Sequence, residues 1–502
     1  MKSVKRNIAA NFVGNIWQAF MALAFIPLYI KFMGIESYGL IGVFASLQAL
    51  FIVLDFGLGA TLSRELARLS VLPDKSQEML DLCRSLEIIY WSIAVLIGLI
   101  VVAFAPLIAY HWVKPGQLSP KTIEQAIMIM GFAMALQWPS SLYSSGLVGL
   151  QRQVLLNIIK IAIGTFRGIG VVFVLWLVSP TISVFFTFQI IVSAINVFLV
   201  AFFLWNSLPH TKYRAVFKKR LLIGVWRFAA GMSGISILAT ILTQLDKVIL
   251  SKMLTLEMFG YYALAGAVAS TIYRLVGPVF SAVYPRFVQL VSLTNQQALK
   301  QLYHKSCQLM SVLILPLAVI VAMFSYELLF IWTQNQVTAQ KTHLLVSILV
   351  CGTALNGLMN VPGGLQLAYG WTSLGLYTNL ISVIILAPLI IFLTHYYGAI
   401  GGATSWVILN VGYIFLVIQI LHRRLLPTEK WHWYWNDTGI PFIAAILVAG
   451  TGRLLVGSKS MPQPIMVLFL IVISLSTFIA VALVTPMTRG WIRVQLAKLN
   501  LC

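Results

Sequence analysis

Apolar runs long enough to cross a membrane constrain the fold of this chain more than any other feature. The first two such runs are residues 8–30 and 38–62. A helix rises 1.5 Å per residue, so about 20 residues cross a hydrocarbon core of about 30 Å. The polar hinge 31–37 between the runs is too short to hold a soluble domain. We therefore expect an antiparallel hairpin of two spanning helices.

The composition favours a membrane protein over a soluble one. Of the 502 residues, 60% are hydrophobic and only 9% are charged, which is typical of integral membrane proteins. A formal net charge of +21 would indicate nucleic-acid binding in a soluble chain. In a membrane protein, excess Lys and Arg instead sets the orientation and meets anionic lipid. We expect membrane lipids, and no nucleic acid, among the partners.

Similar apolar runs recur along the chain and predict an all-α polytopic protein with about fourteen membrane helices. Their expected ranges are 8–30, 38–62, 86–110, 122–149, 154–178, 181–206, 222–251, 258–285, 306–332, 342–370, 373–394, 398–421, 438–456 and 463–485. Charged residues are concentrated in the segments between these runs.

The basic residues are distributed unequally between the two sides of these helices. Of the 34 Lys and Arg residues, six lie in the loops opposite the N-terminus and 23 are assigned to the N-terminal side, including Arg227 near the start of the expected span 222–251. The six are Lys31, Lys114, Lys121, Lys252, Lys341 and Lys459. The other five lie deeper within expected spans. Positive residues accumulate in cytoplasmic loops. Both termini are therefore expected in the cytoplasm.

The hinge after the first helix has a second copy further along the chain. Residues 35–39 read Ile-Glu-Ser-Tyr-Gly and residues 256–260 read Leu-Glu-Met-Phe-Gly, a shift of 256 − 35 = 221. Each copy joins a polar-striped helix to the next helix, and both lie on the expected outer side. This pattern predicts two parallel repeats, as in some transporters.

The repeat and the most basic linker together predict the domain organisation. We expect a six-helix N-lobe at 1–206, a basic cytoplasmic linker at 207–221 and a six-helix C-lobe at 222–424. The remaining residues, 425–502, would supply two further helices and a cytoplasmic tail.

Polar residues and glycines of the opening hairpin, and a second group after the linker, stand in a characteristic order. They are Asn11, Gly14, Pro27, Tyr29, Gly34, Tyr38, Gly39, Leu40, Asp55, Gly57 and Arg64, followed by Asp246, Lys247, Gly260 and Tyr262. This order resembles that of the polysaccharide flippases of the multidrug/oligosaccharidyl-lipid/polysaccharide (MOP) exporter superfamily. The resemblance implies a MATE-like fold.

The same resemblance implies a substrate, a location and partners. Such flippases move undecaprenyl-pyrophosphate-linked oligosaccharides, for example O-antigen repeat units, from the inner to the outer leaflet of the bacterial cytoplasmic membrane. The expected partners are the lipid-linked oligosaccharide, membrane lipids, and the polysaccharide polymerase with its chain-length machinery.

Basic residues within spans are the candidates for binding the pyrophosphate. A charge at the centre of a membrane helix costs about 2.5–3.5 kcal/mol, so it requires a partner or a wet cavity. Arg167 shares a polar helix face with Lys160, and Arg274 lies near the middle of its span. Together with Arg64 of the flippase pattern, these residues are expected to line a cationic cavity between the lobes. Buried ion pairs for the arginines, and a snorkelling side chain for Lys160, remain alternatives.

Acidic residues in spans are the candidates for ion coupling or gating. Asp55 lies seven residues after Gln48, on one polar stripe of the second helix, while Asp246 adjoins Lys247 in the seventh. Adjacent helical residues do not face each other, so Asp246 and Lys247 are expected to meet different partners. A coupling proton or Na⁺ is one candidate for either acid. An interhelical salt bridge or hydrogen bond is the other.

No catalytic pattern is present in the sequence. It contains no G-x-S-x-G, P-loop or H-E-x-x-H motif. The histidines are isolated at helix ends or in loops, and the four cysteines show no metal-ligand spacing, so neither a catalytic site nor a metal site is expected. Apart from a coupling ion, no cofactor is expected. We interpret the chain as a secondary transporter, not an enzyme.

Three alternatives to the polysaccharide flippase remain. A multidrug or small-solute antiporter would favour acids and aromatic residues in its cavity. A lipid II flippase has its own acidic hinge in place of the Gly-x-x-x-Tyr-Gly-Leu form at residues 34–40. A membrane-embedded glycosyltransferase or polymerase, which belongs to a different class, would need a large outer loop with catalytic carboxylates.

Overall fold

The computed structural model describes residues 2–457 and 461–490, and for residues 2–9 and 223–236 it describes the backbone alone. All regular elements in these ranges are helices, which confirms the all-α fold. The isolated bridge between Lys114 and Thr255 is the one β-type contact recorded in these ranges. Lys459, Arg493 and Lys498, which contributed to the charge count, lie outside the described residues.

Contacts divide the chain into two units, Met1–Gly260 and Tyr261–Cys502. The first contains α1 Lys2–Ala24, α2 Ile26–Phe51, η1 Ile52–Asp55, α3 Leu58–Leu69, α4 Ser76–Leu107, η2 Ile108–Trp112, α5 Pro120–Gln137, α6 Ser140–Gly149, α7 Gln153–Leu177, α8 Ile182–Ser207 and α9 Lys219–Met253. The boundary falls inside α10 Leu256–Ser270.

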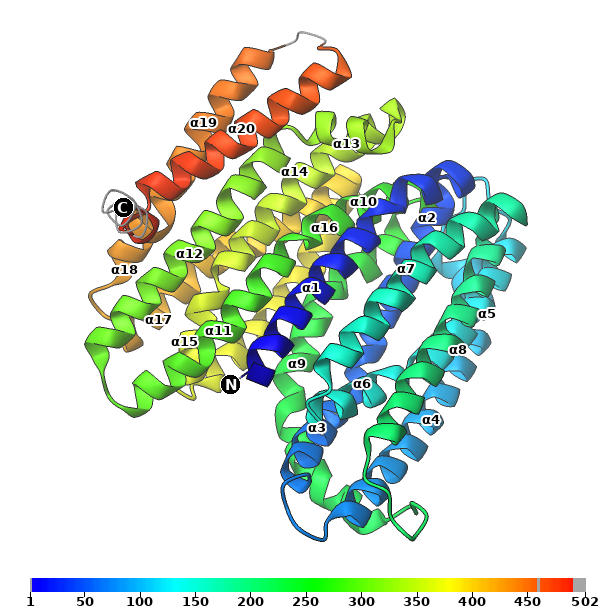
Figure 1. Ribbon diagram of the computed structural model, residues 1–502. Coiled ribbons are helices and arrows are strands. Elements are labelled where there is room, and N and C mark those ends of the chain that lie inside the picture. The colour runs from blue at the N-terminus through cyan, green and yellow to red at the C-terminus, as the bar shows by residue number, and fades with distance from the viewer. Residues whose placement is uncertain (1, 458–460, 491–502) are drawn as a thin grey trace, which may run out of the picture. The chain divides into compact units, whose positions relative to one another are not determined.

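The second unit contains the remaining helices and ends with a packed pair, α19 and α20 (Figure 1). Its elements are α11 Ile272–Ser292, α12 Gln296–Met323, α13 Ser325–Thr333, α14 Gln336–Leu358, α15 Asn360–Ala368, α16 Thr372–Gly412, η3 Tyr413–Val417, α17 Ile418–Leu425, α18 Lys430–His432, η4 Trp433–Gly439, α19 Ile440–Val456 and α20 Gln463–Val484. Helix α12 contacts η4 and both helices of the pair.

The contact boundary differs from the lobe boundary expected at 207–221. Helix α9 packs on α2, α3 and α4 and is therefore grouped with the first unit, although the sequence assigns it to a C-lobe at 222–424. Contacts measure packing, whereas the lobes are defined by the internal repeat. The lobe assignment remains a prediction.

The structure confirms a multi-pass membrane protein. Within the described ranges, ten segments are long and apolar enough to cross a membrane. Their surfaces expose large apolar side chains such as Leu447 of α19 and Leu468 of α20, as expected of helices that face lipid. The count of fourteen remains a prediction. Part of the difference arises because the 54-residue segment Thr372–Leu425 combines two expected spans.

Several expected spans are interrupted helices. The expected span 122–149 consists of α5 and α6, which meet at Trp138 and Pro139, and the expected span 342–370 consists of α14 and α15. Proline has no N–H to donate to the preceding turn, which explains the first break. Helices α10 and α11 are separated at Thr271, and no proline stands at that position. A count of apolar residues is not sensitive to such breaks.

The repeat predicted from one short hinge extends over much of the chain. Helix α5 ends at Gln137, and 137 + 221 = 358 is the last residue of α14. Helix α7 ends at Leu177, and 177 + 221 = 398 is the position at which α16 kinks, with Gly398 at φ 57°. Equivalent breaks at equivalent positions support an internal repeat with this shift.

The two hinge copies contact each other reciprocally. A Cβ on Gly39 would lie 2.4 Å from the carbonyl oxygen of Leu256, and a Cβ on Gly260 would lie 2.3 Å from that of Ile35. Because 35 + 221 = 256 and 39 + 221 = 260, the repeat exchanges these two contacts. Both positions therefore require glycine, since any side chain would collide with backbone. The glycines of the hinge pattern thus have a packing role.

We expect Gly39→Ala to destabilise the protein, because the added methyl group would collide with the Leu256 carbonyl. Overpacking of this kind costs about 1–3 kcal/mol. Gly266→Ala is the matched control, because Gly266 lies in α10 with no atom within 4 Å of its Cβ position. Thermal unfolding of the purified protein in detergent measures the effect. Equal melting temperatures for the two variants would contradict the close hinge contact.

Candidate functional site

The polar stripe of the first helix faces α7. The Asn11 amide donates to Oε1 of Gln153 at 2.7 Å, and the Asn157 amide donates to Oδ1 of Asn11 at 2.6 Å. A Cβ on Gly14 would lie 2.2 Å from Oδ1 of Asn157, so only glycine allows this approach. The Asn-x-x-Gly pattern is thus explained by the packing of α1 against α7, which lie side by side in Figure 1.

The contact between α1 and α7 continues toward Arg167. The amide of Gln18 donates to the carbonyl oxygen of Lys160 at 2.5 Å, and Trp17 donates to the Thr165 hydroxyl at 2.9 Å. Gly164 lies against the Gln18 side chain. These bonds fix the register of α7 one turn before Arg167.

Arg167 is partly buried and unusually free of partners. Its Nε atom is buried and makes no hydrogen bond, and in the described ranges the side chain takes part in no ion pair. Tyr29 of the flippase pattern is near enough to interact with it electrostatically, and the Tyr29 hydroxyl points to the Gly168 carbonyl at 3.5 Å. A guanidinium in this state has unused capacity to bind an anion.

The other candidate bases have exposed side chains. Lys160 lies on α7 two turns before Arg167, and Arg274 lies in the first turn of α11, in the second unit. Neither forms an ion pair within the part of the chain that the structure describes. Arg64 is exposed on α3 and interacts with another residue. The structure therefore brings Lys160 and Arg167 onto one helix and places Arg274 in the other unit.

Asp55 and Gln48 both line a cavity of about 510 Å³ in the first unit, as their shared stripe predicts. Gln137, Ser141 and Ser145 add further polar groups to its wall. The cavity has room for water and for polar partners of the Asp55 carboxylate.

The backbone and one hydrogen bond position the Asp55 carboxylate. Asp55 ends η1, where Phe56 at φ 45° and Gly57 at φ 74° turn the chain into α3. The Tyr90 hydroxyl of α4 donates to Oδ1 of Asp55. This interaction matches the interhelical hydrogen bond that the sequence left open, while the cavity leaves room for an ion.

The partners of Lys247 lie in its own helix, α9. The Lys247 ammonium donates to the Thr243 carbonyl at 3.0 Å and to Oε1 of Gln244 at 3.2 Å, so it points back along α9. Asp246 is partly buried and interacts with another residue.

Glu36, a hinge residue, has a structural role that the sequence did not reveal. It is only 8% exposed, and its carboxylate accepts backbone N–H bonds from Gly116 at 2.7 Å and Gln117 at 2.8 Å. Leu118 donates to it as well, at 3.3 Å. Glu36 therefore fastens the hinge to the loop before α5.

It was wrong to single out Asp55 and Asp246 alone among the acids of the expected spans, which also contain Glu87 and Glu327. Glu87 of α4 accepts from the Tyr143 hydroxyl at 2.6 Å and pairs with Arg84 at 2.6 Å. Glu327 of α13 pairs with Arg453 of α19. The three-residue spacing between Arg84 and Glu87 is the sequence feature that could have indicated their ion pair. Glu327 and Arg453 are 126 residues apart, so no local pattern links them.

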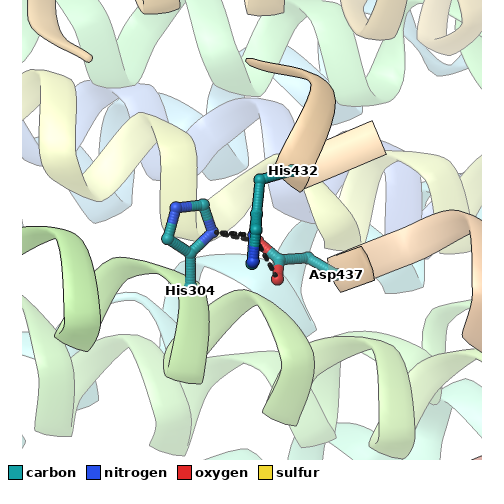
Figure 2. A group of neighbouring side chains, drawn as sticks. All are labelled: His304, His432 and Asp437. Carbon is teal, nitrogen blue, oxygen red and sulfur yellow. Dashed lines mark hydrogen bonds and ion pairs between the residues drawn. The ribbon is translucent and has the colours of Figure 1, made fainter. Parts of the chain in front are cut away.

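The expectation of isolated histidines was also wrong. His304 of α12 and His432 of α18 lie together, with 3.0 Å between their Nδ1 atoms, and Asp437 of η4 lies beside both (Figure 2). Glu429 contacts the other ring nitrogen of His304 at 3.2 Å. A hydrogen bond from Lys300 lowers the pKa of Glu429 to about 2, so Glu429 is ionised at neutral pH.

Comparisons with known proteins agree with this geometry. A Shigella flexneri protein named "Putative O-antigen transporter" is 22% identical over 431 residues, covering 84% of this chain and 98% of that protein. The solved structure of the lipid II flippase MurJ in an inward closed conformation matches with a TM-score of 0.74 at 15% identity, covering 96% of this chain and 99% of that one. An inward-facing MATE multidrug transporter of the MOP superfamily matches with a TM-score of 0.65 at 13% identity, covering 82% and 96%.

At these identities the structural matches establish the fold alone, and they confirm the expected MATE-like architecture. The polysaccharide biosynthesis protein family matches residues 4–291, more than half of the chain. This match begins before the opening hairpin and continues beyond the second hinge group, so it contains every residue of the flippase pattern. The resemblance to polysaccharide flippases of the MOP superfamily is confirmed, and the chain belongs to the polysaccharide biosynthesis protein family.

Proposed function

We propose that this protein flips an undecaprenyl-pyrophosphate-linked oligosaccharide, such as an O-antigen repeat unit, from the inner to the outer leaflet of a bacterial cytoplasmic membrane. Family membership and the name of the Shigella flexneri relative support the substrate class. The lipid II flippase shares the fold. Alternating access by rocking of the two repeats would move the headgroup while the polyprenyl tail stays in lipid.

The observation that carries this proposal is the state of Arg167. Among the described residues its buried Nε atom has no hydrogen-bond partner, which is costly in a membrane helix unless a ligand supplies one. Pyrophosphate offers several charged oxygen acceptors, and the planar guanidinium can bind two of them at once. Lys160, on the same helix, would add positive charge. We assign Arg274 an equivalent role in the second unit, and Arg64 an accessory one.

The ion-pair alternative for Arg167 has little support. Among the described residues no acid pairs with it, and the Asp55 carboxylate is bonded to Tyr90. By contrast, Arg453 is paired with Glu327. A cationic drug would also be repelled by an unpaired guanidinium, which argues against a multidrug antiporter.

The charge bias supports an orientation with both termini in the cytoplasm. Reporter fusions within 207–221 and after residue 490 should therefore report the cytoplasm, and fusions within 113–119 the outside. Activity of a cytoplasm-specific reporter at 113–119 would reverse the orientation and, with it, the proposed direction of transport.

We expect Arg167→Ala and Arg274→Ala each to reduce flipping severely, with Arg167→Lys intermediate. Loss of a desolvated contact to phosphate should cost on the order of 2–5 kcal/mol, and about 1.4 kcal/mol corresponds to a factor of ten. Export of the glycan in a deletion strain complemented with each variant, at matched membrane levels of protein, measures the effect. The lipid-linked intermediate that accumulates in the deletion strain identifies the carried glycan and separates this function from lipid II transport.

Arg286→Ala is the control, because it removes the same charge from α11 at an exposed position that contacts only Gln289 among the recorded partners. Its export should remain close to that of the wild type. Normal export by the Arg167→Ala, Arg274→Ala double variant would contradict the pyrophosphate contact. Loss of folded protein that is rescued by also neutralising Asp55 or Asp246 would instead support a buried ion pair.

We further propose that Asp55 and Asp246 couple transport to a proton or Na⁺ gradient. Asp55→Asn and Asp246→Asn should each make transport insensitive to collapse of that gradient in proteoliposomes. Tyr90→Phe is the matched control for Asp55, because it removes the hydrogen bond but keeps the carboxylate, and it should retain the gradient dependence. If Asp55→Asn also retains the gradient dependence, as Tyr90→Phe should, Asp55 has a structural role only.

A further inference from the structure

We propose that His304, His432 and Asp437 form a binding site for a divalent transition-metal ion, with Zn²⁺ the ion that fits best. One ligand atom from each residue lies within 4.8 Å of the other two. In Figure 2 the two imidazole rings and the carboxylate converge from α12 on one side and from α18 and η4 on the other. The site is separate from the residues assigned to substrate and coupling.

The distances within this cluster are those of a slightly contracted metal site. Nδ1 of His304 lies 2.5 Å from Oδ2 of Asp437 and 3.0 Å from Nδ1 of His432, which in turn lies 3.4 Å from Oδ1 of Asp437. Ligands placed 2.0–2.2 Å from a tetrahedral Zn²⁺ are about 3.3 Å apart. Shifts of less than about 1 Å would therefore accommodate the ion.

Protons alone satisfy these three contacts poorly. If only one ring carries a hydrogen on Nδ1, this single hydrogen must serve both the other ring and the Asp437 carboxylate. If both rings carry one, two N–H donors face each other across 3.0 Å. A cation at the centre would accept a lone pair from His304, His432 and Asp437 at once.

The surrounding residues orient the ligands as metal sites require. The Glu429 carboxylate faces Nε2 of His304 at 3.2 Å. An imidazole that donates its Nε2 hydrogen to this carboxylate has its Nδ1 atom available for a metal ion. The Gln308 amide donates to Oδ1 of Asp437 at 2.9 Å, and its own oxygen accepts from the Met487 N–H at 2.9 Å. Glu429 and Gln308 would thus hold the metal ligands in place by hydrogen bonds without binding the ion themselves.

The donor set and its exposure indicate the ion. Two imidazole nitrogens and one carboxylate oxygen suit Zn²⁺ and similar ions, whereas Ca²⁺ and Mg²⁺ prefer oxygen ligands alone. The Asp437 side chain is fully buried, but the His432 side chain is 40% exposed, which gives an ion a way in and leaves a fourth position for water. A bound ion would fasten α18 and η4, which lead into the α19–α20 pair, to α12.

Zinc binding to the full-length protein tests this site directly. The protein is purified in detergent through a tag without histidine, stripped with EDTA, and titrated with Zn²⁺ by calorimetry, with the bound metal measured by mass spectrometry. We expect one Zn²⁺ per chain and a higher melting temperature. His432→Ala, at a partly exposed position, should lose this binding without loss of folding, and Glu429→Gln should weaken it about 10–100-fold.

His395→Ala is the control, because His395 is an exposed histidine elsewhere in the same unit, and it should bind Zn²⁺ as the wild type does. Asp437→Asn should also abolish binding. No stoichiometric binding by the wild type, or equal binding by His432→Ala, would overturn the proposal. Displacement of Zn²⁺ by millimolar Mg²⁺ would overturn the choice of a transition metal.

Discussion

The hydrocarbon core offers no hydrogen-bond partners, and this constraint determines how the first unit is built. Polar groups of α1 bond to α7: Asn11 bonds to Asn157, and Gln18 bonds to the Lys160 carbonyl. Gly14 and Gly164 allow this contact by leaving room for the amides of the opposite helix. The register of α7 follows from these bonds, and the register of α7 determines where Arg167 lies.

Arg167 is an exception to this rule of pairing. Arg453 follows the rule, because its guanidinium is bonded to Glu327 and packs 5.6 Å from the Phe324 ring centroid. Arg167 has a buried Nε atom that finds no partner in the part of the chain that the structure describes. Because Arg453 is paired, the unsatisfied Nε atom of Arg167 is more simply explained by a ligand that binds there than by a packing error. A lipid-linked pyrophosphate is the ligand that fits the family.

Features that repeat along a helix or along the chain could be predicted from the sequence. The polar stripe of α1, the stripe from Gln48 to Asp55 and the 221-residue repeat are of this kind, because helical periodicity and self-similarity are local properties. The breaks at Thr271 and Phe324 could not be predicted from the apolar pattern, since apolar content continues through them.

Contacts between distant segments could not be predicted from the sequence. His304 and His432 are 128 residues apart, and only the packing of η4 on α12 brings them together. The same holds for Glu36, whose three N–H donors come from a loop about 80 residues away. No periodicity marks such residues, and a histidine at a helix end looks the same whether or not a second one packs against it.

The central claim is that Arg167 binds the pyrophosphate of a lipid-linked oligosaccharide. A structure of the full-length protein in lipid nanodiscs with that substrate bound tests this claim most directly. The account predicts a phosphate oxygen within hydrogen-bond distance of the Arg167 guanidinium, including its Nε atom. A pyrophosphate bound elsewhere, with the Arg167 guanidinium facing only Tyr29 and the α7 backbone, would contradict it.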